Sequence, residues 1–430
     1  MKISKNNNTI RYIAIFMALV YAFTTRSILA KFLFQNQIQL LIFYGIIYVC
    51  LFINFVNSFN ASEKHLYAPK GFYTMSVLFI VIFLGLHVTK NYLSLLYYGL
   101  ALLIPFSVDK TIIESDSVVM FVVFMALFFT VGCFINFLFP SLFKTIFVPL
   151  YSASAQQSLF EVERLSGSST YFAGFTSQVG YTSFFISVGI GCVFCFRESL
   201  FNNEWHILIC MMLGGLLLTG KRGPLIFLLI SLCMIYFVEG YGMERFVRVI
   251  KIAIILMLSY LGLLAVANLT KIDGIVRIYN AVYEFLTSGS VEDAGRSQLH
   301  EQALIYFNNH PIFGIGWSNF KNMYIFRSTH VHCIYLQLLC ETGLFGFSTF
   351  IWFFLSRLCK TFTTVKKGGF VSIPLENSWF KFSLFIQLYF LLYGITGNPL
   401  YDIEETIIYF FAIGISYIPL SSTSKENRRD

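Results

Sequence analysis

Long apolar runs separated by short polar segments dominate the chain. The runs are continuous and do not alternate between polar and apolar residues, so they predict helices rather than strands. A membrane-spanning helix needs about 20 mostly apolar residues, and by that rule the sequence predicts about twelve spans. Their expected limits are residues 10–25, 38–57, 71–88, 91–107, 117–140, 174–196, 205–220, 223–239, 249–268, 333–356, 380–396 and 404–420.

The polar segments between these runs are short, with one exception at residues 269–332. We therefore interpret residues 1–430 as a single integral membrane domain of all-α class with one long loop that carries short surface helices. The sequence contains no evident internal repeat and no nucleotide-binding fingerprint. The first apolar run follows a basic start and lacks a small-residue cleavage site, which predicts a retained span rather than a removed signal peptide.

Composition supports a membrane protein and argues against a soluble one. The 430 residues are 57% hydrophobic and only 12% charged, whereas soluble domains carry about 25% charged residues. So few charges cannot cover the surface of a water-soluble globule. The formal charge of +8 is better explained by membrane topology than by nucleic-acid binding, so we expect no nucleic-acid partner.

The distribution of basic residues orients the chain. An even number of spans puts both termini on one side, and a cytoplasmic location for them places a majority of the 30 lysines and arginines on the cytoplasmic side. This is the bias that cytoplasmic loops show. The sequence therefore predicts cytoplasmic termini and places the long loop, residues 269–332, on the external face.

Chemically interesting residues concentrate in three external segments. The first contains Glu161-Val-Glu163-Arg164-Leu-Ser166-Gly167, and the second is the turn Thr219-Gly220-Lys221-Arg222-Gly223-Pro224. The third is the long loop, with Gly295-Arg296, the turn His310-Pro311-Ile312-Phe313-Gly314-Ile315-Gly316, and His330-Val331-His332 at the start of the tenth run. Proline and two glycines predict a turn at 311–316.

Simpler explanations remain open for each of these residues. Arg164 is compatible with snorkelling at the membrane interface, and Lys221 and Arg222 with a position among lipid headgroups. Gly314 and Gly316 are compatible with ordinary turn glycines. A third ligand at suitable spacing is missing around His330 and His332, so we predict no metal.

Taken together, these segments resemble the O-antigen polymerase/ligase family, which includes Wzy-type polysaccharide polymerases and WaaL-type ligases. The resemblance rests on Gly295-Arg296, on the His310–Gly316 turn, and on His332 followed by Gly343 and Gly346. Two further segments also resemble family motifs, Arg164-Leu-Ser166-Gly167 and Thr219-Gly220-Lys221-Arg222-Gly223. Cys333 departs from the Asn, Ser or Gln that usually follows the histidine, and Lys221 departs from the serine of the turn.

The resemblance implies a fold, a substrate and a location. The expected fold is that of lipid-sugar glycosyltransferases, a GT-C-like architecture. The expected substrate is an oligosaccharide on an undecaprenyl-diphosphate carrier, used on the external or periplasmic face of the bacterial cytoplasmic (inner) membrane without a cofactor or a metal. The expected partners are this lipid-linked oligosaccharide, membrane lipids and a chain-length regulator protein.

The resemblance also implies roles for particular residues. Arginine binds diphosphate through two oxygens and stays charged, so we predict that Arg164, Arg296 and Arg222 bind the leaving group. We predict His332 as the catalytic base that accepts the proton of the attacking sugar hydroxyl, with His330 as its alternative or helper. The remaining predicted contributors shape the site and are the glycines Gly314, Gly316 and Gly343.

Three functions remain open at this point. We favour a polymerase that joins lipid-linked repeat units into O-antigen, capsule or exopolysaccharide. An O-antigen ligase, which transfers the polysaccharide to a lipid A-core acceptor, is the alternative within the family. A flippase of lipid-linked oligosaccharides is the alternative of a different class, but transporters usually carry charged or broken helices near the midplane and an internal repeat.

Overall fold

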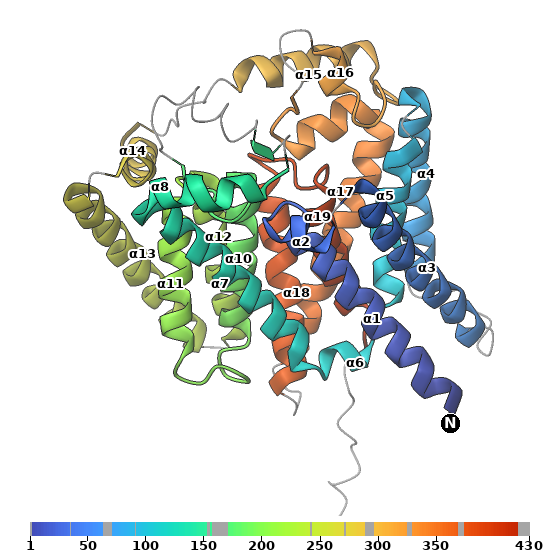
Figure 1. The fold of residues 1–430 in the computed structure, drawn as a ribbon, viewed down its shortest axis with the longest axis horizontal. Coiled ribbons are helices and arrows are strands. Elements are labelled where there is room, and N and C mark those ends of the chain that lie inside the picture. Colours follow the sequence, from blue (N-terminus) through green and yellow to red (C-terminus); the bar gives the residue numbers. More distant parts are fainter. Residues whose placement is uncertain are drawn as a thin grey trace, which may run out of the picture. The chain divides into compact units, whose positions relative to one another are not determined.

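The structure is a computed structural model that describes every residue except 1, 35, 63–70, 91, 153–154, 157–170, 241–242, 271, 289–295, 325–328, 369–373 and 420–430. Within the described ranges the chain folds into helices and forms no strand (Figure 1). An isolated antiparallel β-bridge joins Ser27 and Thr176. The prediction of an all-α chain is therefore confirmed.

The chain divides into two compact units. Unit 1 comprises Met1–Ala22, Phe43–Glu114 and Asp293–Asp430, and unit 2 comprises Phe23–Ile42 and Ser115–Glu292. Each unit combines segments that lie far apart in the sequence. The single membrane domain expected over residues 1–430 stays a prediction, and the two units are described separately below.

Unit 1 is built around three C-terminal helices, which pack on one another and on α4 and α5. Its helices are α1 (Lys2–Thr24), α3 (Gln37–Ser62), α4 (Phe72–Thr89), α5 (Tyr92–Leu103), η2 (Ile104–Phe106), α6 (Lys110–Ile113), α15 (Ser297–Asn309), α16 (Phe320–Met323), α17 (Ile334–Gly368), α18 (Pro374–Tyr393) and α19 (Ile403–Ser416). Every residue of α19 from Glu404 to Ser416 is buried, so this helix is the centre of the unit.

Unit 2 is a second helical bundle, in which α7, α10 and α11 pack on one another. Its helices are α2 (Leu29–Leu33), α7 (Asp116–Leu138), α8 (Pro140–Leu142), η3 (Phe143–Phe147), η4 (Val148–Leu150), α10 (Val179–Cys195), α11 (Trp205–Leu218), α12 (Arg222–Glu239), α13 (Met243–Thr270) and α14 (Asp273–Ser288). A Cβ atom on Gly189 would lie 2.2 Å from that of Ala126, and one on Gly215 would lie 2.9 Å from Thr130. Small residues thus let these apolar helices approach closely.

All twelve predicted runs overlap a helix. Five helices among the described residues are long and apolar enough to cross a membrane: Ile38–Phe59, Asp116–Leu138, Arg222–Glu239, Met243–Leu269 and Ile334–Lys366. Six further apolar helices are shorter, between 10 and 17 residues. These helices agree with a polytopic membrane protein, while the twelve-span topology and the GT-C-like architecture stay predictions.

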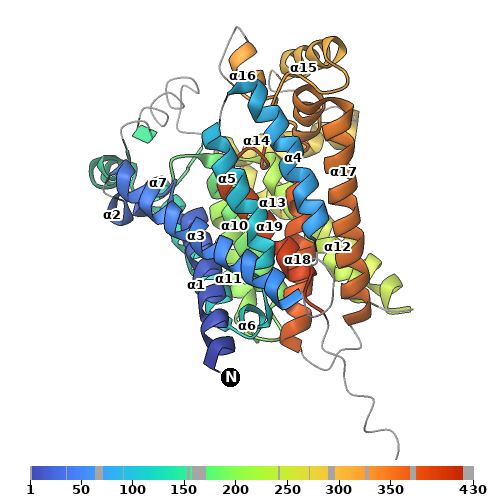
Figure 2. The same ribbon diagram turned by 90° about the vertical axis from the view of Figure 1, so that its right-hand side faces the viewer.

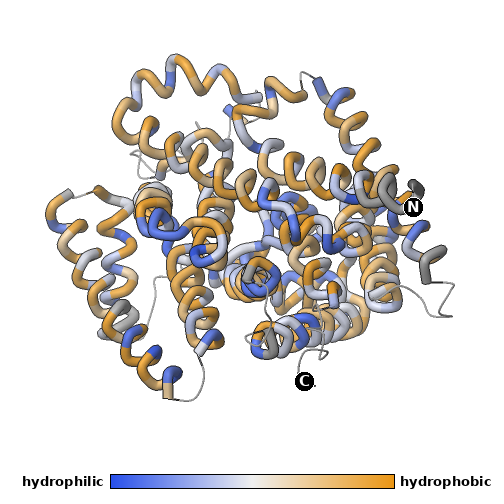
Figure 3. Tube along the Cα trace, turned by 90° about the horizontal axis from the view of Figure 1, so that it is seen from below, coloured by the Kyte–Doolittle hydropathy of each residue, from blue (hydrophilic) through white to orange (hydrophobic). Residues whose placement is uncertain are grey.

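The helices expose apolar side chains as helices in contact with lipid do. Large exposed hydrophobic residues recur along α3, α4 and α13, among them Ile38, Leu41, Ile42, Val49, Phe52, Val77, Ile80, Leu84, Ile254, Met257, Leu258 and Leu261. Figure 3 shows that hydrophobic residues dominate most helices along their length. Apolar surface of this extent would aggregate in water, and it agrees with the composition of the chain.

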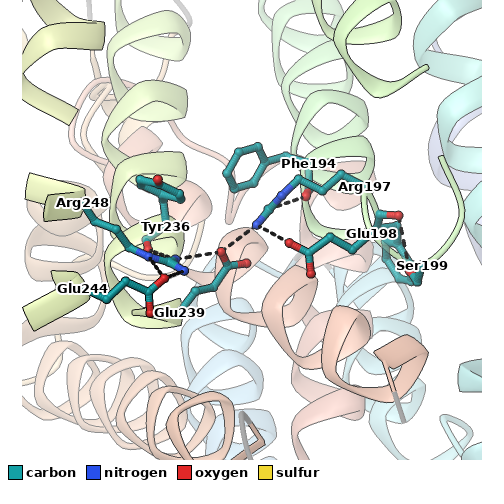
Figure 4. Close-up of polar contacts among 9 residues, drawn as sticks. Phe194, Arg197, Glu198, Ser199, Tyr236, Glu239, Glu244 and Arg248 are labelled. Carbon is teal, nitrogen blue, oxygen red and sulfur yellow. Dashed lines mark hydrogen bonds and ion pairs between the residues drawn. The ribbon is translucent and has the colours of Figure 1, made fainter. Parts of the chain in front are cut away.

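An ionic cluster joins three helix ends in unit 2 (Figure 4). Arg197, which follows α10, donates to Glu239 Oε2 at the end of α12 at 2.7 Å, and Arg248 of α13 donates to the same oxygen at 3.2 Å. The Glu239 side chain is only 6% exposed. Arg248 also contacts Glu244 at 2.6 Å. The cluster lies on the side that the sequence predicts to be cytoplasmic.

The long polar loop contains three helices, and they belong to different units. Helix α14 belongs to unit 2, where Ile275, Ile278 and Ala281 are buried while Tyr283 and Glu284 on the other face are exposed. Helices α15 and α16 belong to unit 1. Figure 1 and Figure 2 show α15 and α16 beyond one end of α17, and in Figure 1 α15 crosses the direction of α17.

Candidate functional site

Helix α17, which begins just after His332, is broken at Gly343. That residue has φ 62° and ψ −169°, which no α-helical residue adopts. A break of this kind leaves carbonyl and N–H groups without helical partners. The turn before α16 supplies those partners on the first side of the break, where Ile315 N donates to Cys340 O at 3.0 Å and Gly316 N donates to Glu341 O at 2.9 Å.

The same turn supplies partners on the second side of the break. Leu344 N donates to Pro311 O at 2.8 Å, and Phe345 N donates to Ile312 O at 3.2 Å. Residues 310–316 and the break in α17 are therefore joined by hydrogen bonds on both sides of Gly343. We call this arrangement the turn–kink pair.

Glycine is required at the centre of the turn–kink pair for two reasons. Gly314 and Gly343 have φ of 69° and 62°, and Gly316 has φ of 101°, so all three occupy the left-handed region. In addition, a Cβ on Gly343 would lie 2.3 Å from the backbone of Ile312, and one on Gly314 would lie 2.3 Å from that of Glu341. Both segments approach too closely for any side chain.

Glu341 is fully buried beside the break and accepts hydrogen bonds on both carboxylate oxygens. Ser318 N donates to Oε2 at 2.7 Å, while Phe320 N donates to Oε1 at 3.1 Å. Gln337, one turn earlier on α17, donates to Oε1 at 3.1 Å. The carboxylate thus fixes the start of the short helix α16 and connects it to α17.

Gln337 links this carboxylate to the first histidine of the predicted pair. Its Nε2 lies 2.7 Å from Nδ1 of His330, and its Oε1 accepts from Val331 N at 3.2 Å. The ring of His330 also lies 5.5 Å from that of Tyr401, centroid to centroid. Burial and the adjacent Glu341 carboxylate both raise the pKa of the Tyr401 phenol, which keeps it protonated.

His332 stands in a different environment from His330. It has φ 59°, one of only four positive values among non-glycine residues in the described ranges. Such a conformation is uncommon for a residue with a side chain, although histidine tolerates it better than most. Its Nε2 lies 3.3 Å from Thr329 Oγ1, and its side chain is half-buried. Helix α17 begins two residues later, at Ile334.

Cys333, which replaces the usual polar neighbour of the histidine, is buried in an apolar cluster. Leu299 and Ala303 of α15 and Phe320 of α16 belong to the same cluster. The next residue, Ile334, donates its N–H to Gly394 O at 2.9 Å. The position after His332 therefore packs α15 against the start of α17 in this protein.

Arg296 occupies the N-cap position of α15 and is half-buried. Leu299 and Ala303 of the same helix pack in one apolar cluster with Cys333, the residue that follows His332. Arg296 and His332 thus belong to the same end of unit 1, although they are far apart in sequence.

The structure describes one of the two other predicted arginines. Arg222 is the first residue of α12 in unit 2 and is half-buried. Near it, Tyr171 lies beneath two cations, with Lys221 Nζ at 5.8 Å and Arg277 Cζ at 5.6 Å from the ring centroid. Arg164 lies outside the described residues, as does the segment around it.

Four members of these polar clusters were not predicted from the sequence, namely Gln337, Glu341, Tyr401 and Arg277. A signal for two of them was present, because Gln337 and Glu341 lie four residues apart on an apolar helix. Polar residues within a membrane helix are functional by default, and this spacing puts them on one face. Among the described residues, no three His, Cys, Asp or Glu side chains form a group that could hold a metal ion.

A protein-family model matches the part of the chain that contains this site. The family model described as O-antigen ligase matches residues 207–351. The match includes Arg222, Arg296 and His332 together with the turn–kink pair, and it begins after Arg164. It confirms the resemblance to the O-antigen polymerase/ligase family. No curated protein matches the chain.

Proposed function

We propose that this protein polymerises undecaprenyl-diphosphate-linked oligosaccharide repeat units into a surface polysaccharide on the external face of the bacterial cytoplasmic membrane. The observation that carries this proposal is the family match over residues 207–351. Within that stretch, a histidine in a rare backbone conformation lies two residues before a broken helix. Backbone strain of this kind concentrates at functional sites.

The proposed reaction is a direct displacement. The oxygen of a sugar hydroxyl on the acceptor forms a bond to the anomeric carbon of the donor. The bond between that carbon and the lipid diphosphate breaks, and its electron pair leaves with the diphosphate. His332 takes the proton of the hydroxyl, a role that suits a side chain that titrates near neutral pH. Attack from the opposite face inverts the anomeric configuration.

The leaving diphosphate gains negative charge as the bond breaks, and cations stabilise it. Of the two predicted arginines that the structure describes, Arg296 belongs to the same unit as His332. We propose Arg222 and Arg164 as further contributors, because the predicted topology puts all three on the external face. Preorganised charges in a site of low dielectric contribute most to such a step. No metal and no cofactor are part of this proposal, and a chain-length regulator is its proposed protein partner.

The O-antigen ligase reaction is the second candidate, since the matched family is described by that activity. Polymerase and ligase share the donor and differ in the acceptor, which is another lipid-linked repeat unit in one case and a lipid A-core in the other. The family match gives no support to a flippase.

An elongation assay tests the proposal. The purified protein is reconstituted in liposomes with lipid-linked repeat units extracted from a strain that lacks it, in the presence of EDTA. We expect a ladder of polymer lengths, and His332→Ala should lower its rate by roughly 10²–10⁴-fold, the usual contribution of a general base. A product that appears only after lipid A-core is added would assign the ligase function. Wild-type rates in a folded His332→Ala variant would remove the base assignment.

A further inference from the structure

The two histidines of the His330-Val331-His332 segment differ in how their ring nitrogens are held. Nδ1 of His330 lies 2.7 Å from the amide nitrogen of Gln337. Nε2 of His332 lies 3.3 Å from a hydroxyl, that of Thr329. An amide nitrogen only donates, whereas a hydroxyl donates or accepts. The first contact constrains the position of the ring proton and the second does not.

The orientation of the Gln337 amide is fixed from two sides. Its Oε1 accepts from the backbone N–H of Val331 at 3.2 Å, and its Nε2 donates to a Glu341 carboxylate oxygen at 3.1 Å. The reversed amide would set N–H against N–H and carbonyl against carboxylate, in a fully buried position. Buried donors and acceptors without partners are unfavourable, because they lose their hydrogen bonds to water and gain none in return. Nε2 is therefore the atom that faces His330.

This orientation determines the tautomer of His330. Because Gln337 donates to Nδ1, that nitrogen carries the lone pair, and the proton of the neutral ring is on Nε2. An Nε2–H group donates hydrogen bonds and accepts no proton. For His330 to act as the base through Nε2, its proton would have to move to Nδ1, where it would face the Gln337 N–H.

We propose that His330 serves the reaction as a hydrogen-bond donor to an oxygen of the lipid-linked substrate, with Gln337 and Glu341 as positioning residues that hold its Nε2–H tautomer, and that His332 alone is the base. This inference rests on the proposed function. The sequence left open which of the two histidines is the base. The proposal assigns that role to His332 and the donor role to His330. The buried carboxylate completes the chain Glu341–Gln337–His330, and it also anchors the start of α16, so ring orientation and local fold depend on the same group.

Glutamine is the suitable residue at position 337, because it combines one acceptor with a nitrogen that donates twice. Glutamate at this position would offer no donor to His330 and would face the carboxylate of Glu341. Methionine has a similar shape and would remove all three contacts. Gln387, a second fully buried glutamine in unit 1, donates to Thr361 and Ser383. It provides a matched control for the loss of a buried amide.

Magnetic resonance of the histidine rings tests the tautomer without any activity. In the protein with 15N-labelled histidine rings, the His330 resonances, assigned by their loss in His330→Gln, should show a protonated Nε2 and an unprotonated Nδ1. Gln337→Met should lose this preference, and Gln387→Met should retain it. A protonated Nδ1 in the wild type would overturn the proposal.

Kinetics test the division of roles. A glutamine side chain carries N–H groups near the place of an imidazole Nε2 but cannot act as a base. We expect His330→Ala to lower kcat by roughly 10²–10³-fold, as the removal of one preorganised donor does, and His330→Gln to recover much of it. His332→Gln should be as slow as His332→Ala. Equal loss in His330→Gln and His330→Ala would overturn the donor role, whereas a wild type without elongation or ligation would instead overturn the proposed function.

Discussion

At the scale of single residues, His332 combines a side chain that can act as a base with an unfavourable backbone conformation. Its φ of 59° lies in the left-handed region, and such a conformation costs an ordinary residue roughly 1–2 kcal/mol. Its Nε2 lies 3.3 Å from the Thr329 hydroxyl, and α17 begins two residues after it. Because a glycine would relieve the strain, the presence of histidine there is explained better by function than by stability.

Replacement of His332 by glycine or alanine separates these two contributions. Both variants should lose polymer formation, since both lack the base. His332→Gly should unfold at a higher temperature than His332→Ala, because glycine adopts the left-handed region without the cost of roughly 1–2 kcal/mol. Thermal unfolding in detergent measures the difference. A His332→Gly variant less stable than His332→Ala would show that φ at this position carries no strain.

Replacement of Arg296 by lysine tests whether this residue binds the diphosphate. Lysine keeps the charge but cannot bind two phosphate oxygens with one fork. Arg296→Lys should lower kcat/KM by roughly 10–100-fold, the equivalent of one charge-assisted hydrogen bond of about 1.5–3 kcal/mol. Arg11→Lys is the control, since Arg11 pairs with Asp109 at 3.4 Å on the predicted cytoplasmic side. Equal kcat/KM values for both variants would contradict diphosphate binding by Arg296.

At the scale of elements, the turn–kink pair explains why a broken helix is stable here. Two N–H groups and two carbonyls around Gly343 find partners in residues 311–316, so the break leaves few backbone groups unpaired. Glu341 adds a buried link to α16. The break, the turn and the chain Glu341–Gln337–His330 consequently depend on one another.

Alanine at Gly343 tests this dependence. The new Cβ would lie 2.3 Å from the backbone of Ile312 at an unfavourable φ, so we expect a loss of stability greater than the roughly 1–2 kcal/mol of the backbone strain alone, together with loss of activity. Gly45→Ala in α3 is the control, because nothing lies within 4 Å of its Cβ position and alanine favours a helix by about 0.5–1 kcal/mol. Similar unfolding temperatures for the two variants would contradict the close approach.

The elements themselves were more predictable from sequence than their pairing. Continuous apolar runs predict helices because only helices satisfy every backbone group within one segment, and every predicted run overlaps one. Pro311 and its glycines likewise predict a turn. The partner of that turn was not predictable, since the hydrogen bond from Ile315 to Cys340 connects segments whose approach depends on packing. The sequence motif identified Gly343 but not the break that requires it.

At the scale of the whole molecule, the division into two units separates the predicted residues. His332, His330 and Arg296 belong to unit 1, and Arg222 to unit 2. The sequence assigned all of them to one external face from charge bias alone, a rule that gives sidedness but no distances. Within unit 2, Arg222 begins α12 and Glu239 ends it. Glu239 binds Arg197 and Arg248, so the ionic cluster lies at the opposite end of α12 from Arg222.

Removal of that carboxylate tests whether the units are stabilised separately. Glu239→Gln should cost about 3–5 kcal/mol, since it leaves two largely buried arginines without a shared partner. Glu198→Gln removes a contact to the same Arg197 from a side chain that is 70% exposed and should cost about 0–1 kcal/mol. Hydrogen exchange should accelerate in α10, α12 and α13 of the Glu239→Gln variant and remain unchanged in α17–α19. Equal acceleration in both units would mean that they unfold together and that the cluster stabilises the whole chain.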